Sequence, residues 1–471
     1  MTHAAILPPI IQGGMGVAVS DWRLARAVAS RGQLGVVSGT AIDTVFVRRL
    51  QDGDLRGDVR RAMAAFPIPG VAKAVLERYF IAGGRAPGTP YKMLPMHRLK
   101  VSTARSQLTA LAGFVEVFLA KEGHSGVVGM NLLTKVQLPN LATLYGALLA
   151  GVDAILMGAG IPREIPGALD RLARHEPASL RLDLEGALAD VERRLELDPQ
   201  ELWPGEHAAL VRPPFLAIIA SNSLATMLSR KATGTVNGFI IEGPTAGGHN
   251  APPRGVASYN EFGEPIYGDR DVVDLAKMRE LGVPFWLAGG TGRAGALATA
   301  QAAGAVGIQV GTLFAYCEES GLETDLKHDA LDHAISGKAT IVTDPRASPT
   351  GYPFKVVEWA GGPNRDAPRE RVCDLGYLRE SYHTPDGKVG YRCAAEPVDQ
   401  YVAKGGKIED TVGRKCLCNA LTADIGQPQV RDGGTEEPPL LTSGDDLDMI
   451  RTFLGDRTRY HANDVLEYLL G

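Results

Sequence analysis

Eight short apolar segments, each followed by residues at helical spacing, predict an α/β fold of the (β/α)8 class, a TIM barrel. The apolar runs are nearly continuous, as expected of parallel strands that are buried on both faces. The last two runs end in Gly-rich turns, which is typical of the phosphate-binding end of such a barrel. The predicted strands span 10–16, 34–40, 127–133, 152–160, 213–221, 236–243 and the beginnings of 283–304 and 305–320.

The chain has 471 residues, whereas a single barrel takes about 250. We therefore predict a barrel domain over 1–340, with inserted segments near 51–100 and 178–212, and an extension over 341–471 that covers or wraps the barrel. The first insertion contains two amphipathic patterns, DVRRAMAAF and VAKAVLERYF. The second is highly charged and predicts a solvated hairpin with a helix. In the extension, DDLDMIRTFLG and ANDVLEYLLG predict helices.

Composition favours a globular enzyme, with 45% hydrophobic residues, 22% charged residues and a formal net charge of -5. The sequence pI of about 6.1 and the lack of a basic patch argue against a nucleic-acid partner. No apolar run approaches the roughly 20 residues that span a bilayer. The start MTHAAILPPI lacks a charged segment before an apolar one, so we expect a cytoplasmic protein with no membrane partner.

Residues 290–295 spell GxGxxG, a pattern that also occurs in dinucleotide-binding Rossmann turns. That fold needs an acidic residue about 20 positions later to hold a ribose. The next strand instead ends in Gln309, Val310, Gly311 and Thr312. Two successive strand ends with glycines suit the phosphate site that TIM barrels form after strands 7 and 8. We therefore favour the barrel phosphate site.

The segment FIIEGPTAGGHNAPPRG (239–255) places one histidine in a Gly-rich turn after an apolar strand. Small residues let the backbone approach a flat ligand, and an imidazole titrates near neutral pH. His249 is therefore a candidate general base, and the alternative is a structural histidine that is hydrogen-bonded in the core. His97 and His124 are expected to be surface or loop histidines.

Five segments together resemble the nitronate monooxygenase family, also called 2-nitropropane dioxygenases, which are FMN-dependent TIM barrels. The segments are IIQGGMGVAVS, MNLL, AGGH, LAGGTG and GIQVGT, in this order over about residues 6–320. The related flavin-dependent enoyl-thioester reductases share most of these elements. The turn departs from the family's EAGGHxG pattern, because Thr245 replaces the acid, Pro244 precedes it and NAPPRG follows. The loop on the substrate side therefore differs, and the substrate can differ with it.

The resemblance implies a role for individual residues. His249 matches the catalytic base, and Asn131 matches an asparagine that contacts FMN; a helix or turn cap is the alternative for Asn131. The first-strand turn lies against the flavin ring, and the glycines after strand 7 and the QxGT group after strand 8 hold the phosphate. The implied FMN-binding residues are Gly14, Met15, Gly16, Asn131, Gly247, Gly248, Gly289, Gly290, Gln309, Val310, Gly311 and Thr312.

Three functions remain open from the sequence. The leading one is an FMN-dependent monooxygenase that oxidises a nitronate or similar carbanion with O2. The second is an NAD(P)H-dependent FMN reductase of enoyl thioesters or quinones. The third is a non-catalytic flavin-binding or partner protein, against which the intact His249 turn argues. The expected partners are a small-molecule substrate and O2, and the sequence leaves NAD(P)H and a homodimer open.

The sequence contains five cysteines, whose thiols are potentially reactive. Cys317, which we place in the helix after strand 8, is expected to be a core thiol. Cys373, Cys393, Cys416 and Cys418 lie in the extension, where four thiolates could hold zinc or an iron-sulfur cluster. Their spacing lacks a CxxC pair, so we predict reduced packing thiols and no metal.

Overall fold

The structure, a computed structural model, describes residues 7–186, 192–363, 366 and 368–471. Its largest sheet has eight parallel strands in the order β1-β10-β9-β8-β7-β4-β3-β2. A parallel bridge between Ile11 and Leu34 joins β1 to the residue before β2, so the sheet closes. The predicted (β/α)8 barrel is confirmed. The strands are β1 (Ile10–Gln12), β2 (Gly35–Ser38), β3 (Val128–Leu133), β4 (Ala154–Gly158), β7 (Phe215–Ile219), β8 (Gly238–Glu242), β9 (Phe285–Ala288) and β10 (Gly307–Val310).

The strands are buried because helices cover their outer face and apolar side chains fill the barrel interior. The interior group includes Ile11, Val36, Leu156, Ile240 and Trp286. The barrel is therefore a packed core. The helices that follow strands are α1 (Trp22–Ala29), α2 (Ile42–Gln51), α6 (Asn140–Leu149), α7 (Ile165–Ala173), α9 (Asn222–Lys231), α10 (Leu275–Glu280), α11 (Ala296–Ala302), α12 (Thr312–Ala315) and α13 (Thr324–Ile335).

Helix α1 shows how the local sequence fixes an element. Asp21 caps its first turn by accepting hydrogen bonds from the backbone N–H groups of Arg23 and Leu24. Trp22, Leu24, Ala25 and Val28 are buried on one face, which is the spacing of an amphipathic helix. The helix therefore packs on the barrel directly after the first-strand turn and fixes where that turn lies.

Both predicted insertions add elements outside the barrel. The first contains α3 (Asp58–Ala64) and α4 (Val71–Tyr79), and α5 (Thr103–Lys121) follows it before β3. The second forms the antiparallel hairpin β5 (Ala178–Arg181) and β6 (Arg194–Leu197), followed by α8 (Pro199–Leu202). The hairpin and helix predicted there are confirmed, although residues 187–191 at its centre lie outside the described residues.

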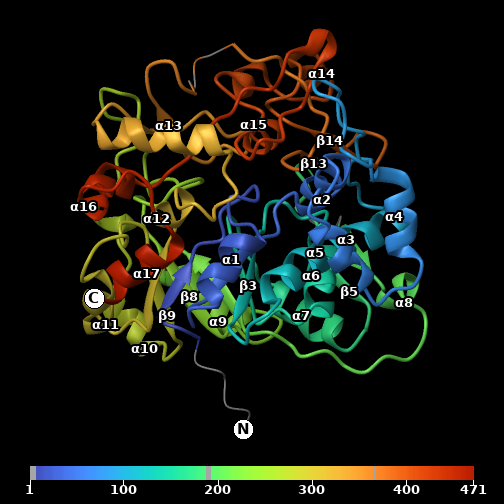
Figure 1. The fold of residues 1–471 in the computed structure, drawn as a ribbon, viewed down its shortest axis with the longest axis horizontal. Coiled ribbons are helices and arrows are strands. Elements are labelled where there is room, and N and C mark those ends of the chain that lie inside the picture. The colour runs from blue at the N-terminus through green and yellow to red at the C-terminus, as the bar shows by residue number, and fades with distance from the viewer. Residues whose placement is uncertain (1–6, 187–191, 364–365, 367) are drawn as a thin grey trace.

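The orange part of the extension is seen above the blue and green segments of the barrel (Figure 1). The red C-terminal helix over 462–470 lies at the left instead and contacts α1, α11 and α12. Two antiparallel strand pairs in the extension were not predicted from the sequence. The first predicted C-terminal helix is a 3-10 helix that continues into α16, and the second is α17. A division of the chain near residue 340 remains our proposal. The elements are β11 (Thr340–Asp344), β12 (Phe354–Glu358), β13 (Glu380–His383), β14 (Val389–Arg392), α14 (Val398–Ala403), α15 (Leu417–Ala423), η4 (Asp445–Met449), α16 (Ile450–Leu454) and α17 (Ala462–Leu470).

A buried cluster of polar side chains connects the extension to α2 and α5 by hydrogen bonds. The carboxylate of Asp43 accepts hydrogen bonds from Arg105 and from the hydroxyl of Tyr377, and its Oδ2 lies 2.8 Å from Nε2 of His97. Burial alone would raise the pKa of Asp43, but Arg105 and His97 hold it well below its usual value. His97 lies in a loop, one of the two places expected for it, but it is buried and not at the surface. Asp43 and Arg105 both contact its Nε2.

Two further sequence expectations concern single features. Cys317 is a buried core thiol as predicted, but it lies two residues beyond α12, so its placement inside a helix is wrong. Within the described part of the chain, no helix has both the length and the apolar character needed to cross a membrane.

Candidate functional site

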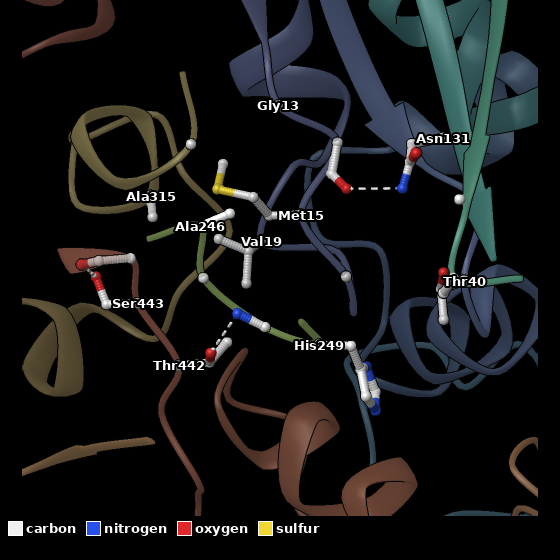
Figure 2. A pocket seen from close by; sticks show the side chains of 18 of the residues that line it. Gly13, Met15, Val19, Thr40, Asn131, Ala246, His249, Ala315, Thr442 and Ser443 are labelled. Carbon is white, nitrogen blue, oxygen red and sulfur yellow. Dashed lines mark hydrogen bonds between the residues drawn. The ribbon is translucent and has the colours of Figure 1, made fainter. Parts of the chain in front are cut away.

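A cavity of about 240 Å³ lies at the carboxyl ends of the barrel strands. Residues from strand ends far apart in the sequence meet there, and Figure 2 shows Met15, Asn131 and His249 around it. The predicted site residues in the cavity wall are Gly14, Met15, Gly16, Asn131, Gly247, Gly248, His249, Gly289, Gly290, Gln309, Gly311 and Thr312. Val310 is buried at the end of β10 outside this wall.

The first-strand turn is held against the end of β3. Nδ2 of Asn131 donates a hydrogen bond of 2.9 Å to the carbonyl oxygen of Gly14 (Figure 2). A Cβ on Gly14 would lie 2.2 Å from the Cβ of Asn131, so only glycine fits at this position. Oδ1 of Asn131 is buried and has no hydrogen-bond partner among the described residues. One side of the amide therefore positions the turn, and the oxygen on the other side has no partner among the described residues.

The loops after β9 and β10 meet the Gly-rich turn after β8. Gly290 has a φ of +67°, which favours glycine, and a Cβ there would lie 3.3 Å from Oγ1 of Thr245. Gly311 has an ordinary φ, and the nearest atom to an added Cβ is Sδ of Met15 at 3.7 Å. The protein itself therefore leaves room beside Gly311, on the cavity side of the loop.

His249 follows the Gly-rich turn and is held from the extension. Its Nε2 lies 2.6 Å from Oγ of Ser348, and Oγ of Ser348 lies 2.8 Å from Oγ1 of Thr350. Its ring packs edge-on against Phe354 at a centroid distance of 4.9 Å. Burial, followed by the charge of Lys135, lowers the pKa of His249 to about 4. The imidazole is therefore neutral near pH 7 and can accept a proton.

Glu242, the last residue of β8, is a titratable residue that sequence analysis did not select. It lines the cavity and also a second cavity of about 280 Å³ on the other side of the turn. Both cavities include His249, Ala159 and Ile218, so Glu242 and His249 lie at their common boundary. Burial raises the pKa of Glu242 to about 7. An acid ending an otherwise apolar barrel strand was the signal that could have identified it.

Lys135 and Ser348 were also missed. The Nζ of Lys135 lies 3.2 Å from the ring centroid of Tyr352, which belongs to the second cavity. Burial lowers the pKa of Lys135 to about 8, and the residue still contributes a positive charge near His249 at neutral pH. Nothing in the sequence around Ser348 indicates its contact with a histidine in a distant loop.

The extension completes the wall near the predicted phosphate loops. The N–H of Gly248 donates to Oγ1 of Thr442 (2.9 Å), and the N–H of Gly444 donates to Oγ1 of Thr312 (3.1 Å). Oδ2 of Asp446 accepts a 2.9 Å hydrogen bond from the N–H of Gly292. Burial raises the pKa of Asp446. A carboxyl group therefore lies beside the glycines that were predicted to bind phosphate, which no sequence motif indicated.

Solved structures of similar overall arrangement share little sequence with this chain. FabK from Thermotoga maritima is 15% identical, with 99% of this chain and 93% of that chain covered and a TM-score of 0.48. A nitroalkane oxidase from Streptomyces ansochromogenes is 16% identical, with 98% of this chain and 94% of that chain covered and a TM-score of 0.48. The enoyl reductase domain of MlnA from Bacillus amyloliquefaciens is 10% identical, with 98% of this chain and 94% of that chain covered and a TM-score of 0.47.

No protein of curated function matches the chain in sequence. The family model "NMO: Nitronate monooxygenase" matches residues 208–347, a segment that contains β8 to β10, the His249 turn and the loops after β9 and β10. This match confirms, over that segment, the resemblance that the motifs indicated. Over these residues, the chain is similar to the nitronate monooxygenase family.

Proposed function

We propose that this protein binds FMN in the cavity at the strand ends and oxidises a nitronate or similar carbanion, with O2 as the final electron acceptor. The observation that carries the proposal is the position of His249, a neutral and buried imidazole at the boundary of two cavities. A flavin bound beside it would accept electrons from a substrate carbanion and pass them to O2.

The residues around the cavity suit a flavin. Oδ1 of Asn131 and Oε1 of Gln309 are buried without a partner in the described residues, and both belong to side chains of the cavity wall. Such groups need a hydrogen-bonding partner, and the polar edge of a flavin ring would supply one. Gly14 and Gly16 bring the backbone of the first-strand turn close to the cavity, and the loops at Gly290 and Gly311 would hold the phosphate.

His249 would remove a proton from a carbon that a neighbouring nitro or carbonyl group makes acidic. Ser348 lies within hydrogen-bonding distance of Nε2, and Phe354 packs against the ring, so the imidazole has one orientation. The positive charge of Lys135 would stabilise the anion that this step produces. The second cavity, on the far side of His249, would accept the remainder of the substrate.

Oxygen consumption tests the function directly. We expect the purified, FMN-loaded enzyme to consume O2 with a nitroalkane or with the preformed nitronate in the absence of any nicotinamide. An enzyme that turns over neither compound, but reduces an enoyl thioester or a quinone with NADH or NADPH, would show that the reductase is the correct function.

The identity of the cofactor is the first specific prediction. We expect heat-released cofactor to be FMN, because the loops after β9 and β10 would provide one phosphate site and the described barrel contains no Rossmann unit for an adenine dinucleotide. Chromatography of the released flavin against FMN and FAD standards measures this. FAD, or no flavin after reconstitution with FMN, would contradict our assignment of these loops.

The second prediction concerns Glu242 and pH. Glu242 is neutral below about pH 7 and ionised above it, and its carboxylate would repel an anionic substrate in the adjoining cavity. We expect kcat/KM for a preformed nitronate to fall roughly tenfold as the pH rises through this range, a size typical of one nearby like charge. Glu242→Gln should remove this fall.

The exposed residue Glu261 provides a matched control, because it lines neither cavity. Glu261→Gln should keep the wild-type pH profile. If Glu242→Gln keeps it as well, another group is responsible for the titration.

A further inference from the structure

The buried side chain of Asn250 leaves one polar atom without a partner at the wall of the second cavity. The residue is only 2% exposed. Its Nδ2 donates a hydrogen bond of 3.0 Å to the carbonyl oxygen of Ala246, and this contact fixes the orientation of the amide, because a carbonyl oxygen can only accept. Oδ1 lies on the other side of the amide and has no hydrogen-bond partner among the described residues. A buried polar atom of this kind needs a partner, and a ligand in the second cavity would supply one.

The chain around Asn250 holds this oxygen in place. The N–H of Asn250 donates a 2.9 Å hydrogen bond to the carbonyl oxygen of Pro353. The preceding residue, His249, forms an antiparallel bridge with Phe354 at the start of β12. The backbone and the side-chain amide of Asn250 are therefore both hydrogen-bonded, and Oδ1 has a fixed position relative to the ring of His249.

The two neighbouring side chains serve different parts of the site. His249 lines both cavities, whereas Asn250 lines only the second. A substrate whose acidic carbon lies at His249 would therefore place its remainder beside Asn250. Aliphatic and aromatic residues of the second cavity surround that space, namely Ile161, Ile218, Ile219, Leu224, Tyr267 and Tyr352. A short carbon chain would contact this apolar wall, and a polar group at its end would meet Oδ1.

The charges in the wall favour an uncharged end group. The guanidinium of Arg254 donates hydrogen bonds to the carbonyl oxygens of Ala220 and Arg270. The backbone N–H of the same arginine donates to Oδ1 of Asp271, whose carboxylate also belongs to the wall. Glu242 adds a second carboxyl group to this cavity. A substrate carboxylate would thus meet like charges and an arginine that is already engaged, whereas a neutral donor would meet the free oxygen of Asn250.

We propose that Asn250 determines the specificity of the second cavity, and that the substrate is a carbon acid whose far end carries a hydroxyl or amide group that donates a hydrogen bond to Oδ1. The substrate class rests on the function proposed above, because it places the reacting carbon at His249. A nitroalkane that ends in an uncharged donor binds better than its alkyl or carboxylate analogue, since neither a methyl group nor a carboxylate can satisfy the buried oxygen.

Four small nitro compounds of similar size test this preference by direct binding. The first pair, 3-nitropropan-1-ol and 1-nitrobutane, differs only by a hydroxyl in place of a methyl group. The second pair, 3-nitropropanamide and 3-nitropropionate, exchanges an amide for a carboxylate. Kd is measured by ligand-observed NMR on the purified full-length protein, with O2 excluded so that turnover does not consume the compound.

We expect 3-nitropropan-1-ol to bind about three- to tenfold more tightly than 1-nitrobutane, the usual effect of one hydrogen bond to a neutral group. The amide should likewise bind more tightly than the carboxylate. Whichever of the alcohol and the amide binds more tightly identifies the donor group that the cavity accepts.

A substitution of Asn250 tests whether its oxygen makes the contact. In Asn250→Leu, a change of similar volume, the alcohol and 1-nitrobutane should bind equally. This variant also loses the hydrogen bond to Ala246, so circular dichroism and the unfolding temperature check its fold. Asn463→Leu is the matched control, because it loses a side-chain hydrogen bond to Glu467 in α17 and lines neither cavity. It should keep the wild-type ratio of the two Kd values.

The pH dependence separates Asn250 from Glu242 and needs no variant of Asn250. An amide does not titrate, so the ratio of the Kd values for the alcohol and 1-nitrobutane should be the same in the wild type at about pH 6 and about pH 8. Burial raises the pKa of Glu242 to about 7. A ratio that changes over this range in the wild type, but is constant in Glu242→Gln, would assign the contact to Glu242 and overturn the role of Asn250.

Three further results would overturn the proposed specificity. They are equal binding of the alcohol and 1-nitrobutane by the wild type, no binding of either compound, and tighter binding of the carboxylate than of the amide. Failure of the proposed function would look different. The alcohol would then bind with the expected preference, but its addition in air would cause no consumption of O2.

Discussion

Replacement of His249 by alanine or asparagine is expected to leave FMN bound and to lower turnover of a neutral nitroalkane by roughly 10²- to 10⁴-fold, the usual contribution of a general base. Preformed nitronate should be affected much less, because its proton has already been removed. The measurement is kcat/KM for both forms of one substrate, together with flavin content per chain. An equal loss for nitroalkane and nitronate would show that His249 positions the substrate and does not accept its proton.

Acid pH provides a second test of the same residue. His249 accepts a proton only in its neutral form, and its pKa is about 4. Wild-type activity on the neutral substrate should therefore persist to mildly acidic pH and fall toward pH 4, and the residual activity of His249→Asn should lack this limb. His124 is the control, because its Nε2 contacts the carbonyl oxygen of Ala120 and it lines neither cavity. His124→Asn should keep both the rate and the profile.

Replacement of Gly311 by valine is expected to weaken FMN binding at least tenfold, because the new side chain would occupy the space that the phosphate or its loop needs. The nearest protein atom to an added Cβ is 3.7 Å away, and φ at Gly311 is ordinary, so the fold should tolerate the change. Gly290→Val should lose flavin too, but its positive φ adds backbone strain. Flavin content and the Kd for FMN are the measurements.

A substitution of Asp446 serves as a control, because it should not weaken FMN binding. Its carboxyl group lies next to the same loops and accepts from the N–H of Gly292, so a charge at this position would oppose a bound phosphate. Asp446→Asn should therefore bind FMN as tightly as the wild type or more tightly. Full flavin occupancy in both Gly311→Val and Gly290→Val would mean that the phosphate binds elsewhere.

The barrel was predictable because its strands are buried on both faces, which leaves apolar runs that can be counted. Their ends were less predictable. The first strand was predicted over 10–16 but ends at Gln12, because the glycines that follow leave the sheet to form the turn at the cavity. The strands β11 and β12 were not predicted, since each is short and they pair across a loop rich in Gly, Pro and Ser.

The candidate site was predictable where its residues lie at strand ends. His249, Asn131 and the glycines belong to motifs that follow apolar runs, and the structure brings them to one cavity. Asp446 lines the cavity from the extension, and Ser348 contacts His249 from it. Both contacts depend on how the extension folds against the barrel.

Anaerobic mixing of the FMN-loaded enzyme with substrate, followed through the flavin absorbance, is the most direct test of the central claim that His249 and the cavity serve carbanion oxidation. We predict rapid loss of flavin absorbance with nitronate in both wild type and His249→Asn, rapid loss with neutral nitroalkane only in the wild type, and slow or no loss with NADH or NADPH. Rapid loss with a nicotinamide and none with nitronate would contradict the account.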